Sequence, residues 1–335
     1  MTSFLIQLKR RTAPLRRAVR YRNRRPLSDA CDPDDSVILA SSGRSGSTFL
    51  AGLLNWDQQF RYLFEPLHPS WVKQFGNQPK QPYLPAGSDN AALLKDVSDA
   101  YSGALSNPWI DQYNPQRNPD RRLVKVIRGN LTLAGYTEKF PRSKCIFLLR
   151  NPLAQALSAV RGNWKLDPTS FGRQPEFRAK YPELVQHLNQ CPSDPFLRAI
   201  TFWCVENLIP LVELNFSKIK HLRYEDLVTN PQQQIAGLFE YIGKDFDQRV
   251  LDLVDVRSKT TRATDKGNPL TRWKTILSDE QQGQASQILQ DFGLDSLYDD
   301  QGLPGSSIEQ VQQALSGNKF VGSAPCVGAS SSTSK

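Results

Sequence analysis

The sequence contains few residues that form metal sites or disulfides, with five cysteines and three histidines among 335 residues. The cysteines are odd in number, widely scattered and without a Cys-x-x-Cys pair, which argues against a disulfide framework. His68, His187 and His221 lie far apart and show no metal-ligand spacing. We therefore expect reduced thiols, as in a cytoplasmic protein, and no metal site.

Long hydrophobic runs are also absent. No stretch approaches the roughly 18 consecutive apolar residues that a membrane-spanning helix needs. The apolar stretch near the N-terminus is too short for the hydrophobic region of a secretory signal. We expect a water-soluble, cytoplasmic protein whose 39% of hydrophobic residues can bury a sizeable core.

The net charge of +9 is concentrated at the N-terminus. Residues 1–30 hold nine of the 42 Lys and Arg residues and one of the 33 acidic residues, so the remaining chain is almost neutral. The basicity therefore belongs to a leader, and we expect no nucleic-acid partner. Because apolar residues precede the cations, residues 1–25 would suit an anionic membrane surface; the alternative is a solvated, mobile leader.

Short apolar runs alternate with segments of helical periodicity, which is typical of an α/β fold with a central parallel sheet flanked by helices. The predicted strands are 36–42, 61–66, 121–129, 144–150 and 219–227. The predicted helices are 47–55, 90–105, 132–140, 152–163, 195–215, 231–242 and 279–290. Loops are predicted over 69–89, 107–120 and 164–182. We predict a flexible basic leader over 1–33, one domain over 34–300, and a tail over 301–335 with a short helix and a disordered end.

The turn after the first predicted strand reads SSGRSGSTFLAGLL, residues 41–54. It lacks the P-loop and dinucleotide-binding patterns and the glycine that a hydrolase elbow needs at position 47. Ser45 and Gly46 allow close backbone approach, Ser47 and Thr48 add hydroxyl donors, and Arg44 brings a forked cation. The turn therefore predicts a phosphate or sulfate site at a helix N-terminus; the alternative is a capped helix with a surface arginine.

This pattern resembles the phosphosulfate-binding loop of sulfotransferases, whose donor is 3′-phosphoadenosine-5′-phosphosulfate (PAPS) and whose product is adenosine 3′,5′-bisphosphate (PAP). The arginine variant, with FEP following it, looks most like the carbohydrate sulfotransferase branch. The resemblance implies a P-loop-like fold and a reaction that needs no metal. Phe49 lies where family members often carry an aromatic residue that stacks on adenine, although a buried helix residue is an equal alternative.

A second stretch, KCIFLLRNPLAQALSAV over 144–160, resembles the other signature of the family, a strand ending in arginine followed by Asn-Pro and a helix. The resemblance implies that Arg150 and Ser158 bind the 3′-phosphate of the donor. Asn151 and Pro152 also fit the cap and first position of a helix.

Two later stretches extend the resemblance to about residues 36–278. HLRYEDL resembles a family strand whose tyrosine, here Tyr224, lies near the adenine; the alternative is a core strand capped by acidic residues. In TRATDKGNPLTRWK, Lys266 and Gly267 match a loop that approaches the 3′-phosphate. The Trp-Lys pair follows one residue later than in many cytosolic relatives, so the assignment of this loop is less exact.

Sulfuryl transfer to a hydroxyl requires neutralisation of charge on the leaving phosphate, which suits Arg44, and a base for the acceptor proton. Glu65 ends the second predicted strand and is the first candidate for this base. His68 is the alternative base, and Glu65 has an alternative structural role in holding a loop. Lys125 and Arg128 are set aside, because basic residues at strand ends are commonly solvated.

Aromatic residues populate the predicted loops, and their faces suit sugar rings: Trp71, Tyr83, Trp109, Tyr113 and Trp164. We therefore expect a hydroxyl-bearing acceptor that is a saccharide or a glycolipid. Two other functions stay open, a P-loop-type nucleotide kinase and a non-catalytic nucleotide-binding protein.

Overall fold

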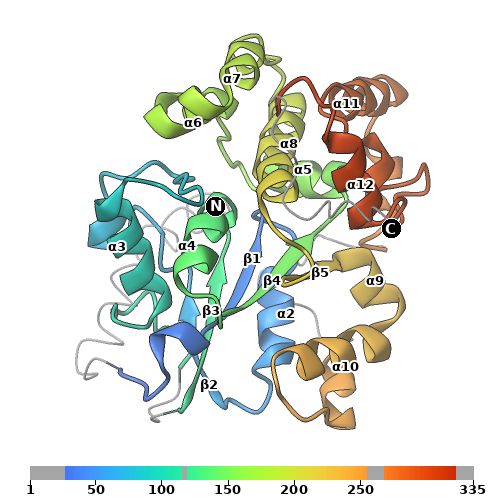
Figure 1. Ribbon diagram of the computed structural model, residues 1–335. Helices are drawn as coiled ribbons and strands as arrows, with labels where there is room; N and C mark the ends of the chain where they lie inside the picture. The colour runs from blue at the N-terminus through green and yellow to red at the C-terminus, as the bar shows by residue number, and fades with distance from the viewer. Residues whose placement is uncertain (1–26, 115–118, 255–267, 322–335) are drawn as a thin grey trace, which may run out of the picture.

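Five parallel strands form one sheet in the computed structural model of the protein, which describes residues 27–114, 119–254 and 268–321 (Figure 1). The strands are β1 Val37–Ser41, β2 Phe60–Phe64, β3 Arg121–Val126, β4 Lys144–Leu149 and β5 Lys220–Arg223. Their order in the sheet is β2-β3-β1-β4-β5, and every pairing is parallel. The predicted α/β fold with a central parallel sheet is confirmed.

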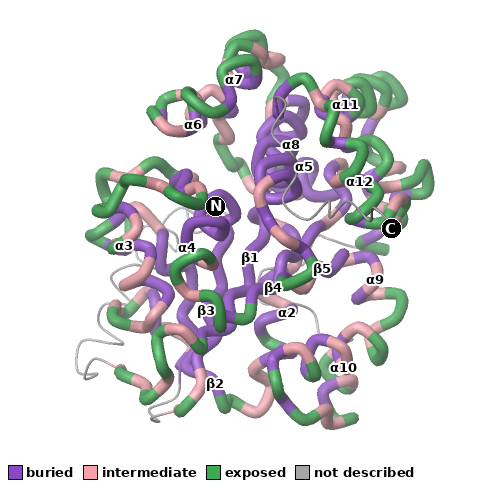
Figure 2. Tube along the Cα trace, viewed as in Figure 1, coloured by how far each residue is buried: buried purple, intermediate pink, exposed green. Residues whose placement is uncertain are grey.

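Helices cover both faces of the sheet, which buries the strands on both sides (Figure 2). One face packs against α3 Ala91–Tyr101, α4 Leu133–Lys139, α5 Pro152–Arg161, α8 Pro195–Glu213, α11 Asp279–Asp291 and α12 Ile308–Leu315. The other face packs against α2 Ser47–Leu54 and α10 Pro231–Tyr241. Such double burial explains why β1 and β4 read as largely continuous apolar runs rather than as alternating patterns.

The seven predicted helices are present, with ends that differ by a few residues. Two predictions are wrong. The predicted strand 219–227 ends at Arg223, where α9 Tyr224–Thr229 begins. The predicted loop 164–182 contains two short helices, η4 Pro168–Arg173 and α6 Pro175–Lys180, and α7 Pro182–Leu188 begins at its end.

Helix α8 is the central helix of the larger core, and 16 of its 19 residues are buried. The Asp194 carboxylate caps it by accepting hydrogen bonds from the backbone N–H groups of Phe196 and Leu197. Among the described residues, α8 alone is long and apolar enough to cross a membrane, contrary to the absence of such a segment that we expected. Its apolar window is 89% buried inside the protein, as the core helix of a folded domain would be.

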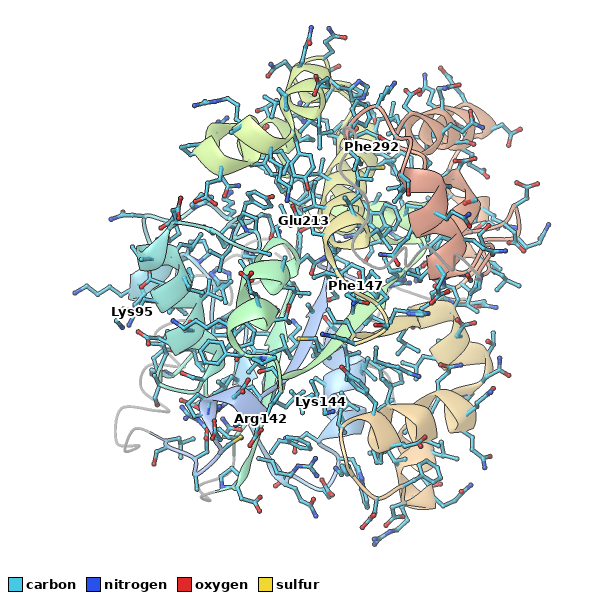
Figure 3. The ribbon with its side chains drawn as sticks, viewed as in Figure 1. Lys95, Arg142, Lys144, Phe147, Glu213 and Phe292 are labelled. Atoms are coloured by element: carbon cyan, nitrogen blue, oxygen red, sulfur yellow. The ribbon has the colours of Figure 1, made fainter. Side chains whose placement is uncertain are left out.

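An ion-pair cluster joins the N-terminal segment to the amino ends of β2 and β3. Asp29, 1% exposed, pairs with Arg122 and with Arg61 Nη1 at 3.2 Å, and Arg61 Nε also reaches Asp111 Oδ1 at 3.1 Å. The ion pair of Lys95 with Asp99 is by contrast a surface pair, since the Lys95 side chain is 74% exposed and points away from the protein (Figure 3). Residues 27–33 of the predicted leader therefore pack on the sheet edge, whereas residues 1–26 lie outside the described residues.

Strand β1 is central because the chain leaves it on one side for β2 and β3 and then crosses to β4 on the other side. At such a switch point the loops that follow neighbouring strands diverge and leave a crevice beyond the carboxyl ends of the strands. The turns after β1 and β4 border this crevice. These are the two turns that carry the predicted anion-binding residues.

Candidate active site

The turn between β1 and α2 has an unusual backbone that brings it close to a tyrosine. Arg44 and Gly46 have positive φ angles, 73° and 89°. Gly46 occupies the N-cap of α2, and no side chain caps this helix end. A Cβ atom at position 46 would lie 2.6 Å from the Tyr224 ring, so only glycine fits. The helix start thus keeps its backbone N–H groups uncapped by side chains, as an anion site requires.

Small hydroxylic side chains surround this helix start. Ser45 is fully buried, and its Oγ has no hydrogen-bond partner among the described residues. Burial of a hydroxyl without a partner costs free energy, so this group fits a site completed by a polar ligand. Ser47 is also buried, whereas Thr48 is half-buried. Phe49 is half-buried and packs on the α2 face of the sheet, so its stacking on adenine stays a prediction.

The side chains from the two predicted anion sites meet in one place. Arg44 Nε donates to Ser158 Oγ at 3.1 Å, and Arg150 Nη1 donates to the Arg44 carbonyl at 2.9 Å. The Arg150 guanidinium also lies over the Tyr224 ring, 4.5 Å from its centroid. Four residues from three stretches that are distant in sequence, Arg44, Arg150, Ser158 and Tyr224, therefore form one basic cradle. The buried Arg150 Nε has no partner among the described residues, which leaves a donor for an anion.

Helix α5 holds this cradle together. Asn151 Oδ1 accepts from the Ala154 N–H at 3.1 Å, and Pro152 occupies the first turn, as predicted for this cap. The buried Gln155 side chain donates from Nε2 to the Gly43 carbonyl in the β1–α2 turn. The orientation of α5 therefore fixes the position of Arg150 relative to the turn.

Lys266 and Gly267 lie outside the described residues, so their predicted contact with the 3′-phosphate stays a prediction. The segment that follows them does reach the cradle, because the Pro269 carbonyl accepts from Arg150 Nη2 at 3.3 Å. Trp273 is buried, and Lys274 contacts Gln301.

Glu65 lies beyond the carboxyl end of β2 in a left-handed backbone conformation with φ of 46°. Its Oε1 accepts from Lys125 Nζ at 2.7 Å and its Oε2 from Arg128 Nη1 at 3.0 Å. Burial alone would raise the pKa of this carboxyl, but the two cations outweigh burial and lower the pKa below its ordinary value. Glu65 is therefore ionised at neutral pH.

Setting aside Lys125 and Arg128 as solvated was wrong. Lys125 is 2% exposed, and its pKa is lowered mainly by burial, against which Glu65 acts. Arg44 also acts on Lys125 electrostatically, so this lysine joins the predicted base to the donor turn. Lysine is rarely buried unless it is paired, so a lysine inside a strand that is buried on both faces indicates an ion pair. The sequence alone did not show which residue is its partner.

His68, the alternative base, lies beside Glu65. Burial and the neighbouring Arg128 lower its pKa to about 4, so its imidazole is neutral at pH 7. Its Nδ1 accepts from the Ser70 N–H at 3.2 Å. The ring contacts Trp109, which stacks on the exposed Trp71 at 5.3 Å and donates from Nε1 to the Glu65 carbonyl at 3.2 Å.

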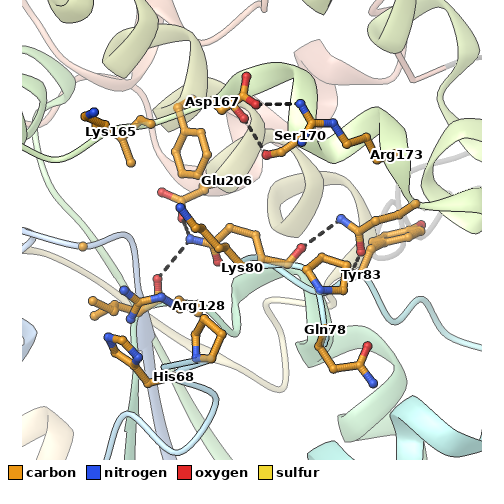
Figure 4. A pocket seen from close by; sticks show the side chains of 18 of the residues that line it. His68, Gln78, Lys80, Tyr83, Arg128, Lys165, Asp167, Ser170, Arg173 and Glu206 are labelled. Atoms are coloured by element: carbon orange, nitrogen blue, oxygen red, sulfur yellow. Dashed lines mark hydrogen bonds and ion pairs between the residues drawn. The ribbon is translucent and has the colours of Figure 1, made fainter. Parts of the chain in front are cut away.

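A cavity of about 840 Å³ opens next to these groups (Figure 4). Gly43 of the donor turn, His68, Arg128 and Trp164 are among the residues that line it. A Cβ at Gly43 would lie 2.3 Å from the Trp164 ring, so this tryptophan packs directly on the turn. The cavity therefore borders the donor turn at Gly43 and one candidate base, His68, while Glu65 contacts it through Arg128, so an acceptor would need to lie there.

The other predicted aromatic residues differ in their surroundings. Tyr83 lines the cavity but is buried, and its hydroxyl donates to Glu213. Tyr113 stacks on Tyr62, away from the cavity. Within the described residues, no group of three or more His, Cys, Asp and Glu side chains is placed to hold a metal ion.

A parallel α/β sheet with a basic cradle at its switch point is an arrangement typical of proteins that bind phosphate-bearing ligands beyond the strand ends. Residues 36–248 match the sulfotransferase family, which is more than half of the chain. The chain therefore belongs to the sulfotransferase family and is an enzyme of that family.

Solved structures similar to this chain carry the same family name. The sulfotransferase domain from the curacin biosynthetic pathway is 22% identical, with a TM-score of 0.41 and coverage of 76% of this chain and 97% of that domain. The sulfotransferase from Alicyclobacillus acidocaldarius is 12% identical, with a TM-score of 0.41 and coverage of 81% and 95%. Mouse sulfotransferase SULT7A1, crystallised with PAP, is 12% identical, with a TM-score of 0.41 and coverage of 85% and 91%. No curated protein sequence is significantly similar to this chain.

Substituting Gly46 by alanine is expected to abolish measurable PAP binding, because the new Cβ meets the Tyr224 ring and the positive φ strains any other residue. Gly52→Ala in the same helix is the matched control, since no atom lies within 4 Å of a Cβ there. This control is expected to keep PAP affinity and to gain roughly 0.5–1 kcal/mol of stability. Calorimetry with PAP checks both variants, and unchanged PAP affinity in Gly46→Ala would remove this turn from the donor site.

Proposed function

We propose that the protein transfers a sulfuryl group from PAPS to a hydroxyl of a saccharide or glycolipid, with Glu65 as the base. The observation that carries the proposal is the convergence of Arg44, Arg150, Ser158 and Tyr224 on one cradle, next to a cavity that His68 and Arg128 line. A bisphosphorylated nucleotide carries anionic groups at two positions, which two arginines from separate turns suit. The family assignment favours this function over an ATP-dependent kinase.

The reaction forms a bond between the acceptor oxygen and sulfur and breaks the bond between sulfur and the phosphate oxygen. The leaving phosphate keeps the electron pair, and Arg44 with the N-terminus of α2 stabilises the charge that develops there. Glu65, ionised through Lys125 and Arg128, takes the acceptor proton. His68 is neutral and also capable of taking this proton, and because the pKa of both groups is lowered, basicity does not separate the two candidates.

The saccharide assignment rests on the aromatic faces near the cavity. Trp164 lines the cavity, and the Trp71–Trp109 stack lies against His68, with Trp71 39% exposed. Flat aromatic surfaces beside a polar cavity suit the apolar faces of sugar rings. Residues 1–25 lie outside the described residues, so a cytoplasmic location with peripheral contact to an anionic membrane stays part of the proposal.

Calorimetric titration with PAP and with ATP tests the donor. We expect PAP to bind more tightly than ATP, because PAP carries a 3′-phosphate that the proposed cradle would bind and ATP carries no phosphate at that position. Tight ATP binding without PAP binding would overturn the proposed function in favour of a kinase.

Replacing Arg150 by alanine is expected to weaken PAP binding by about 1.5–3 kcal/mol, because a charged hydrogen bond to the 3′-phosphate is lost. Binding of adenosine 5′-monophosphate should change little, since that ligand has no 3′-phosphate. Arg178→Ala, on the exposed side of α6, is the control and should leave both affinities unchanged. Equal losses for the two nucleotides in Arg150→Ala would remove Arg150 from the proposed role.

A further inference from the structure

A buried carboxyl group lines the cavity on the side of α8. Glu206 is 2% exposed, and it forms no ion pair with any residue that the structure describes. Its Oε1 accepts from Gln81 Nε2 at 2.5 Å. Figure 4 shows Glu206 among the residues that line the cavity, which also include Lys80, Arg128 and His68. An acidic residue this deeply buried without a cation is unusual in a protein that only needs to fold.

Burial raises the pKa of the Glu206 carboxyl to about 8, against the smaller effects of Ser42 and Arg128. At neutral pH the group is therefore mostly protonated and has an O–H to donate as well as a carbonyl oxygen to accept. Its neighbour Asn207 already supports the donor turn, since Asn207 Nδ2 donates to Ser42 Oγ at 3.2 Å. The proposed transfer reaction uses no acidic residue at this position.

Two amide oxygens from residues that line the same cavity as Glu206 lack partners among the described residues. Gln81 donates through Nε2 to Glu206, and Gln155 donates through Nε2 to the Gly43 carbonyl, so each amide is held at its nitrogen. The Oε1 atoms of both side chains are buried without a hydrogen bond, and both residues line the cavity. An apolar ligand would leave these acceptors unsatisfied, whereas a ligand hydroxyl would satisfy them.

We propose that Glu206, Gln81 and Gln155 form a subsite that binds a second hydroxyl of the acceptor, so that the acceptor is a polyol rather than a mono-alcohol or a phenol. This inference rests on the proposed function and specifies its acceptor. A hydroxyl both donates and accepts, which matches a carboxylic acid next to amide oxygens.

Arg128 interacts with both the proposed base, Glu65, and the subsite residue Glu206. It bonds to Glu65 at 3.0 Å and also acts on Glu206 electrostatically. The hydroxyl that reacts would lie at Glu65, and the second hydroxyl at Glu206, with Arg128 between the two carboxyl groups. Glu206 is thus a positioning and specificity residue, and it takes no part in proton transfer.

Sulfuryl transfer from radiolabelled PAPS to trans-1,2-cyclohexanediol and to cyclohexanol tests the subsite, because the two rings differ by one hydroxyl. We expect kcat/KM to be about 10- to 100-fold higher for the diol, the range that loss of one buried hydrogen bond gives. Glu206→Leu should raise KM for the diol by a similar factor. It should leave cyclohexanol turnover and PAP affinity unchanged. Glu206→Gln, which keeps a neutral donor and acceptor, should retain most of the diol preference.

Glu213→Gln, seven residues further along α8, is the control for general disturbance of that helix. Glu213 does not line the cavity, and glutamine keeps an acceptor oxygen for the hydroxyls of Tyr83 and Tyr181, so the diol preference should persist. Three results would overturn the subsite. The wild-type protein could turn over the diol and cyclohexanol equally, it could fail to turn over the diol, or Glu206→Leu could lose activity equally for both alcohols. If PAP binds and cyclohexanol is sulfated, the proposed function survives that result. Failure to bind PAP would instead contradict the proposed function itself.

Discussion

Replacement of Glu65 by glutamine is expected to lower kcat by about 10²- to 10⁴-fold, the range attributed to loss of a general base. Glutamine has nearly the same shape but cannot take the acceptor proton. PAP affinity should stay nearly unchanged, because the donor cradle is built from the turns after β1 and β4. Steady-state kinetics with PAPS, together with calorimetric titration of PAP, checks both expectations.

Two control variants separate catalysis from folding. Glu65→Gln also leaves the buried Lys125 and the half-buried Arg128 without this counter-charge, so its thermal unfolding must be measured alongside activity. Glu65→Asp keeps the negative charge and should therefore be more stable than Glu65→Gln. It should still react slowly, because its shorter side chain places the carboxylate farther from the acceptor hydroxyl. If His68→Asn lost more activity than Glu65→Gln, His68 would be the base and Glu65 would hold the loop.

The strands of the sheet and the residues of the donor turn could be predicted because their signals are local. Strands β1 and β4 are largely apolar runs, and the Asn151–Pro152 cap is read from adjacent letters. The loop predicted over 164–182 was wrong because this segment contains short helices. Pro168, Pro175 and Pro182 each begin a short helix, where proline needs no N–H partner.

The part of the site that could not be predicted depends on contacts between distant residues. Glu65 meets Lys125 and Arg128, which are 60 and 63 residues away, and Gln81 meets Glu206 across 125 residues. No local pattern signals that a charged residue in one strand faces a partner in another. The topology of the sheet makes these contacts, because β2 and β3 are adjacent and α8 packs over the same core.

Asp29→Asn is expected to lower the free energy of unfolding by about 3–5 kcal/mol, since a buried ion pair loses one partner and leaves the other charged. Arg122 would keep only neutral partners such as Ser36 Oγ and the Cys31 carbonyl, whereas Arg61 would keep Asp111. Residues 27–31 should then detach from the amino ends of β2 and β3. Urea unfolding monitored by circular dichroism measures this loss.

The location of Asp29 makes this prediction separable from effects on activity. Arg61 and Arg122 lie at the amino ends of their strands, whereas the donor cradle lies beyond the carboxyl ends of β1 and β4. PAP affinity should therefore be unchanged at temperatures where the variant is folded. Asp247→Asn, which breaks an exposed pair with Arg249, is the matched control and should change stability little. If Asp29→Asn were as mild as this control, the buried cluster would contribute little to stability, and the N-terminal segment would be held mainly by other contacts.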